Sequence, residues 1–174
     1  MTDCHKQLLE LLSRSCAKLH TLLTRLTLRE DVAEDLMQEL FIKLSDVATF
    51  KKISNLDSYA YRTAVNLAFD WRRSNKSRQI EVPLNVVAEP VSNDCSPLNA
   101  LMRNEMVQKI LSAVGRLNGT AREAFVMRYI QQESYEFVAD QLDKTPHQVR
   151  ALCYKVMNYL RDVLGSAGKE MHDV

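Results

Sequence analysis

The chain has 174 residues, of which 46% are hydrophobic and 26% charged, and its formal net charge at pH 7 is only +1. This composition is typical of a soluble globular protein and excludes a uniformly polycationic chain. The length suits one ordinary domain or two small ones. Only four Gly and four Pro are present, which disfavours a turn-rich all-β fold, and the many strong helix formers predict an all-α fold.

Three kinds of site have no signature in the sequence. No apolar run is long enough for a signal peptide or a membrane span, so we expect a cytoplasmic protein without membrane insertion. The four Cys and four His form no C-x-x-C motif and no shared cluster, so we expect reduced thiols and no metal. Without a Gly-rich phosphate loop or a nucleophile–base pair, we expect no catalytic residues, no cofactor and no enzymatic activity.

The first part of the chain predicts two amphipathic helices. Regularly spaced leucines predict a helix over 6–28, and Asp31 could cap a second helix over 32–47. One face of this second helix is apolar, with Leu36, Leu40, Phe41 and Leu44. Its other sides are polar and rich in acids, with Glu34, Asp35, Gln38 and Lys43. Those sides are either a solvated surface or a docking surface for a basic partner.

A loop over 50–58 precedes a central helix, for which Asp57 or Ser58 is the predicted N-cap. Small or apolar residues recur in it at helical spacing: Ala60, Ala64, Leu67, Ala68 and Trp71. Residues 51–80 carry seven Lys/Arg against two Asp/Glu. Aromatic rings stack on unpaired bases and cations bind phosphates, so this stretch suits a surface for single-stranded nucleic acid. A packed helix with a solvated basic end is the alternative.

A segment over 81–97 separates this basic stretch from the rest of the chain. It holds three of the four Pro, three acids and no Lys or Arg, which predicts an extended acidic linker and not a strand. We therefore predict two small helical domains, over 1–80 and 98–165, with a tail over 166–174.

The second domain begins with a predicted helix over 98–114, with Ser96 as its cap and Pro97 at its first position. Its core candidates are Leu101, Met106, Ile110, Leu111 and Val114. Two short helices are expected over 120–130 and 134–142. After a turn with Thr145 as a possible cap, a longer helix reaches about Leu164, with an apolar stripe of Val149, Leu152, Cys153, Val156 and Leu160.

A short helix, a tight turn and a longer helix have the layout of a helix-turn-helix. In that motif the first turns of the second helix enter the DNA major groove, where Gln and Arg bind base edges. The residues at those positions are His147, Gln148, Arg150, Ala151, Tyr154 and Lys155. An ordinary helical hairpin is the alternative.

Three segments resemble, in order, the motifs of bacterial sigma factors of the extracytoplasmic-function group. AEDLMQELFIKL over 33–44 is similar to the D-x-x-Q-x-x-F-x-x-L pattern of the polymerase-binding helix. SYAYRTAVNLAFDWRR over 58–73 is similar to the promoter-melting helix, and LNGTAREAFVMRYIQQESYEFVADQL over 117–142 to the start of the C-terminal domain. The opening LNG-x-x-REAF also resembles the FecI-like iron-uptake subgroup, whose partners are FecR-like anti-sigma regulators.

The resemblance implies a role for each domain. The first domain would bind the β′ clamp helices of core RNA polymerase through Asp35, Gln38, Phe41 and Leu44. It would open the minus-ten element of promoter DNA through Asn55, Ser58, Tyr59, Tyr61, Arg62, Asn66, Arg72, Arg73, Lys76 and Arg78. The second domain would bind the minus-thirty-five element through the helix-turn-helix residues and would contact the β flap. An anti-sigma factor is a further implied partner.

The second domain departs from the family pattern. Asp143-Lys144-Thr145 replaces the usual turn, and Leu152 and Phe137 stand where an Arg and an acid are typical. Between residues 134 and 161 there are four basic side chains against three acidic ones, which is a small positive charge for duplex binding. We therefore expect weak or altered minus-thirty-five recognition. A stand-alone duplex-binding regulator and a polymerase-binding adaptor without DNA recognition stay open as alternatives.

Overall fold

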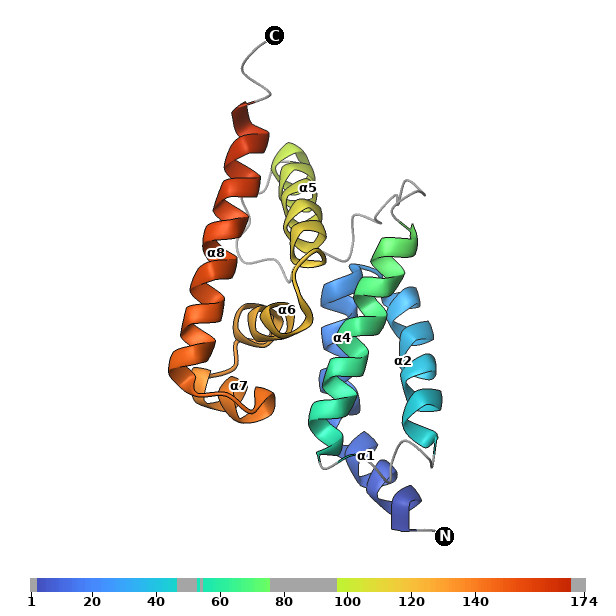
Figure 1. Ribbon diagram of the computed structural model, residues 1–174. Coiled ribbons are helices and arrows are strands. Elements are labelled where there is room, and N and C mark those ends of the chain that lie inside the picture. Colours follow the sequence, from blue (N-terminus) through green and yellow to red (C-terminus); the bar gives the residue numbers. More distant parts are fainter. Residues whose placement is uncertain (1–2, 47–52, 54, 76–96, 170–174) are drawn as a thin grey trace. The chain divides into compact units, whose positions relative to one another are not determined.

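The computed structural model describes residues 3–46, 53, 55–75 and 97–169, and within these ranges every regular element is a helix (Figure 1). The predicted all-α fold is confirmed. The chain divides into two compact units, residues 1–86 and 87–174. The predicted acidic linker lies outside the described residues except for Pro97, and the exact domain limits stay a prediction.

The first unit packs three helices side by side: α1 (Asp3–Thr27), α2 (Glu30–Ser45) and α4 (Leu56–Asn75) (Figure 1). Each helix supplies a buried stripe, and burying one leucine side chain contributes about 1.5–3 kcal/mol. Alanines on α4 carry little bulk, so neighbouring helices can approach it closely. The side chains with at most 1% exposure include Leu22, Leu23, Leu26, Leu40, Leu44, Ala60, Ala64, Val65 and Ala68.

Two of the predicted N-caps in this unit are wrong. Helix α2 begins at Glu30, after an extended Arg29, so Asp31 lies in the first turn and pairs with Arg29. An acid in the first turn is favoured by the helix dipole without capping the helix. Helix α4 is capped by Asn55, whose Oδ1 accepts the backbone N–H of Ser58 at 3.0 Å. Asp57 instead binds Arg14 of α1 at 2.6 Å.

The second unit contains α5 (Pro97–Val114), α6 (Gly119–Phe125), a π-helical turn (Val126–Ile130), α7 (Tyr135–Leu142) and α8 (Pro146–Lys169). Asn118 and Ser134 cap α6 and α7 through backbone N–H groups at 2.9 and 3.1 Å. Helix α8 contacts α5, α6 and α7. Its predicted stripe is buried at Val149, Cys153, Val156 and Leu160, while Leu152 is half-buried.

The predicted core of α5 is only partly correct. Leu111 and Val114 are buried, but Leu101 and Met106 are 49% and 48% exposed. Apolar side chains occur on more than one side of this helix, so their spacing does not single out one buried face. The buried apolar residues in the described part of α5 lie near its C-terminal end, where the chain turns into α6.

Candidate polymerase and nucleic-acid interfaces

The outer face of α2 combines polar and apolar exposed side chains. Asp35, Gln38 and Phe41 follow one another at a spacing of three, which places them on one side of the helix. Phe41 is 44% exposed, and its neighbour Ile42 is 68% exposed. Large apolar side chains that stand together at a surface mark interaction sites more often than single ones do. We call Asp35, Gln38, Phe41 and Ile42 the α2 outer face.

Leu44 does not belong to this face. Its exposed fraction is 0%, and it lies in the core of the unit with Leu36 and Leu40. A spacing of four residues groups these three leucines on the inner side, whereas Phe41 is exposed. The prediction of a polymerase contact at Leu44 is therefore corrected to a packing role.

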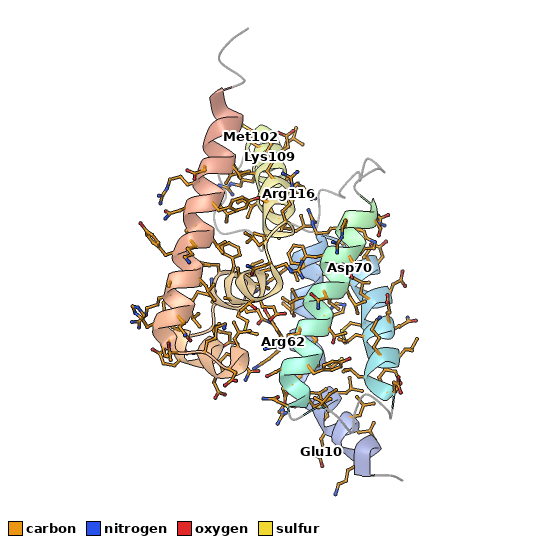
Figure 2. The ribbon with its side chains drawn as sticks, viewed as in Figure 1. Glu10, Arg62, Asp70, Met102, Lys109 and Arg116 are labelled. Atoms are coloured by element: carbon orange, nitrogen blue, oxygen red, sulfur yellow. The ribbon has the colours of Figure 1, made fainter. Side chains whose placement is uncertain are left out.

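Along α4, Arg62, Asn66 and Arg73 are exposed. Figure 2 shows Arg62 and Asp70 at successive levels of this helix. Asp70 forms an ion pair with Arg73, so one acid sits among the cations. The helix therefore presents a polar, cation-bearing face, as a surface for nucleic acid requires.

The start of α4 holds three more of the predicted minus-ten residues. Ser58 and Tyr59 are half-buried, and Asn55 is exposed. The Oδ1 atom of Asn55 is occupied by the helix cap, so its NH₂ group is the part that suits a base acceptor.

Two predicted minus-ten residues, Tyr61 and Arg72, contribute to the packing of the unit. Tyr61 is only 8% exposed and lies in the core of the unit, so its ring offers no stacking surface in this conformation. Arg72 donates through Nη1 to the carbonyl oxygen of Leu26 at 3.1 Å, at the end of α1. Burial lowers the pKa of Arg72 to about 10, so the guanidinium is still charged at pH 7. Lys76 and Arg78 lie outside the described residues.

Backbone conformation and hydrogen bonds fix the turn between α7 and α8. Asp143 adopts the left-handed conformation, with φ 52° and ψ 52°, which Gly, Asn and Asp tolerate best. Thr145 Oγ1 accepts the backbone N–H of Gln148 at 3.2 Å, and Gln148 Oε1 accepts that of Thr145 at 3.0 Å. This reciprocal pair is a capping box. The prediction that Thr145 caps the second helix is confirmed.

All six predicted recognition residues lie exposed on the first three turns of α8, opposite the buried stripe that begins with Val149. Tyr154 is 68% exposed. Gln148 uses its side-chain oxygen in the capping box, which leaves its NH₂ group as a donor. The arrangement is that of a helix-turn-helix with a solvent-facing second helix, and the DNA contacts themselves stay a prediction.

Two features were missed from the sequence. Ile42 of the α2 outer face could have been found, because it lies four residues after Gln38. The second is a cluster of Arg side chains over the Tyr135 ring, where the guanidinium carbons of Arg128 and Arg150 lie 4.7 and 5.1 Å from the ring centroid. No short-range pattern predicts that cluster, because it depends on how α7 and α8 pack.

The described residues contain neither a candidate metal site nor a candidate membrane span. No three His, Cys, Asp or Glu side chains in the described ranges are grouped in a way that could hold a metal ion. Among the same residues, no helix has both the length and the apolar character that a bilayer span requires.

Comparison with known proteins adds independent evidence on the family. The family model of sigma-70 region 2 matches residues 11–78, the stretch that runs from α1 through α4. The ECF RNA polymerase sigma-E factor of Haemophilus influenzae is 27% identical over 164 residues, which cover 87% of this chain and 84% of that protein. These matches make the chain similar to sigma factors of the extracytoplasmic-function group. The similarity supports a role in transcription initiation.

A solved structure of the sigma factor RpoE in complex with the anti-sigma factor NepR from Bartonella quintana is also similar. It is 22% identical, with a TM-score of 0.47, and the match covers 92% of this chain and 98% of that chain. The FecI-like subgroup stays a prediction.

Proposed function

We propose that this chain is a sigma factor that binds core RNA polymerase through the α2 outer face and engages promoter DNA through two other surfaces. One is the polar face of α4, for the minus-ten element, and the other is the start of α8, for the minus-thirty-five element. The observation that carries the proposal is the exposure of Phe41 and Ile42 beside Asp35 and Gln38, while the leucines of the same helix are buried.

The α2 outer face suits a basic helical partner such as the β′ clamp helices. Phe41 and Ile42 would lose water-exposed apolar area on binding, which contributes about 25 cal/mol for each Å² buried. Asp35 is exposed, and together with Glu34 it would favour cationic partners during encounter. Interfaces commonly combine an apolar centre with a charged rim of this kind.

The α4 surface suits an opened promoter strand. Arg62 and Arg73 would bind phosphates, and Asn66 would offer both a donor and an acceptor to an unpaired base. Extruding a base from the duplex costs a few kcal/mol, which contacts of this kind must offset. The half-buried Tyr59 and the NH₂ group of Asn55 lie at the beginning of the same helix and would complete the surface.

The start of α8 suits the major groove of duplex DNA. Gln148 and Arg150 would bind base edges and Lys155 a phosphate. The small positive charge between residues 134 and 161 supports weak minus-thirty-five recognition. Each phosphate contact contributes to the affinity for DNA and to the salt dependence of that affinity. The β flap of the polymerase and an anti-sigma factor are the further partners that we propose from the family.

A binding experiment with core polymerase tests the α2 assignment. Phe41→Ala combined with Ile42→Ala should weaken the affinity for core polymerase about tenfold or more, since exposed apolar anchors dominate interface energetics. The melting temperature of the free protein should stay unchanged. Leu9→Ala is the matched control, because Leu9 of α1 is also an exposed large apolar residue, at 54%. Unchanged binding by the double variant would refute the assignment.

A further inference from the structure

The first turn of α7 contacts a predicted recognition residue of α8. The guanidinium carbon of Arg150 lies 5.1 Å from the centroid of the Tyr135 ring. Its Nη2 atom lies 3.8 Å from Oε1 of Glu136. A cation at this distance from an aromatic ring is attracted by the negative face of the ring. Arg150 therefore has two partners on the neighbouring helix in the free protein.

The Tyr135 ring is itself restrained. The guanidinium carbon of Arg128 lies 4.7 Å from the same ring centroid. Arg128 is fixed in turn, because its Nη1 donates to the carbonyl oxygen of Glu133 at 3.1 Å. Ser134 caps the turn that carries Tyr135 and Glu136. The support for Arg150 thus comes from a capped helix turn and a second anchored arginine.

Such support matters for base recognition, because an Arg side chain in solution samples many rotamers. A planar guanidinium must present two N–H groups in one orientation to bind a guanine edge. Contacts that restrict the side chain beforehand lower the entropy lost on binding. The carboxylate of Glu136 attracts one side of the guanidinium, and the ring of Tyr135 restricts its plane.

We propose that Tyr135 and Glu136 are positioning residues for Arg150, and that they set base discrimination at the promoter position that Arg150 contacts. The inference rests on the proposed function, since it requires Arg150 to contact duplex DNA. It also gives a role to Glu136, which stands next to Phe137, the position where the family pattern has an acid.

The test uses holoenzyme reconstituted from the full chain and core polymerase, with promoter fragments randomised upstream of the start site. Sequencing the transcripts gives the preference for each base at each upstream position. Arg150→Ala should lower the preference at one position about tenfold. Tyr135→Leu and Glu136→Gln should each lower it about two- to fivefold at that same position.

Two controls separate positioning from general effects. Tyr135→Phe keeps the ring and should retain the preference. Asp140→Asn removes an exposed acid from the same helix and should also retain it. Because a base preference is a ratio, a general gain in DNA affinity on losing a negative charge cancels out. Melting temperatures establish that each variant is folded.

Three results of this experiment would have different consequences for the positioning role and for the proposed function. If Arg150→Ala loses the preference while Tyr135→Leu and Glu136→Gln keep it, the positioning role is refuted and the proposed function stands. If Arg150→Ala itself changes no preference, the positioning role and the proposed base contact of Arg150 are both refuted, while the α2 assignment stands or falls with its own binding experiment. If Tyr135→Leu and Glu136→Gln weaken every upstream position equally, their role is structural and the inference is overturned.

Discussion

Arg72 and Arg73 are neighbours at the end of α4, yet their surroundings differ. Arg72 is half-buried and donates to the carbonyl oxygen of Leu26, where it satisfies a backbone group that the end of α1 leaves without a helical partner. Arg73 is exposed and forms an ion pair with Asp70, three residues earlier in the same helix. One arginine therefore joins two helices, whereas the other is available to phosphate.

We expect this difference to appear in single variants. Arg72→Ala should lower the free energy of unfolding by about 1–3 kcal/mol, because a hydrogen bond from a charged group is lost at a partly buried carbonyl. Arg73→Ala should change it by less than about 0.5 kcal/mol, as exposed ion pairs contribute little. Urea denaturation measures both, and equal losses would contradict the assignment.

Leu44 and Ile42 of α2 also differ in their surroundings, because Leu44 is buried and Ile42 is exposed. Leu44→Ala should cost about 2–5 kcal/mol of stability, because it opens a cavity in the core. Ile42→Ala should leave stability nearly unchanged, since the side chain is 68% exposed. Thermal unfolding with a parallel core-binding assay checks both. A folded, stable Leu44→Ala protein that fails to bind polymerase would restore the contact role to Leu44.

At the scale of elements, the beginning of α8 serves two purposes. Thr145 and Gln148 close the capping box that starts the helix, and Gln148 is also exposed toward the predicted DNA side. Asp143 ends α7 in a left-handed conformation, after which Lys144 N–H donates back to the carbonyl of Ala139 at 2.9 Å. The turn geometry and the recognition surface therefore share residues.

A pair of substitutions at Gln148 separates its two roles. Gln148→Ala should lower the free energy of unfolding by about 1 kcal/mol through loss of the reciprocal cap. Gln148→Glu preserves an acceptor for the N–H of Thr145, so stability should be retained. It loses the amide donor, and base preference should change. Calorimetry and transcript sequencing test the two parts, and equal destabilisation by both variants would show that the reciprocal bond is unimportant.

At the scale of the whole molecule, much of the architecture could be predicted. Leucine and valine spacing located α1, α2 and α8, because a stripe buried along a helix has a regular period. Thr145 marked a helix start, since hydroxyl side chains bind backbone N–H groups there. The start of α4 was missed, because Asn55, Asp57 and Ser58 all suit an N-cap and only the packed structure distinguishes them.

The candidate surfaces were predicted less completely than the fold. Motif spacing identified the exposed residues Asp35, Gln38 and Phe41, but it also included Leu44 and Tyr61, which are buried. A motif records which residues recur together and does not separate partner contacts from packing. The contacts between Tyr135 and the two arginines arise from tertiary packing, which local periodicity does not contain.

Transcription reconstituted from purified components tests the central claim most directly. The chain is mixed with core RNA polymerase and a pool of promoter fragments, and the transcripts are sequenced. We predict specific start sites that appear only when the chain is present and that disappear when Phe41 and Ile42 are both replaced by alanine. Binding to core polymerase without new start sites, or binding to duplex DNA without any dependence on polymerase, would contradict the account.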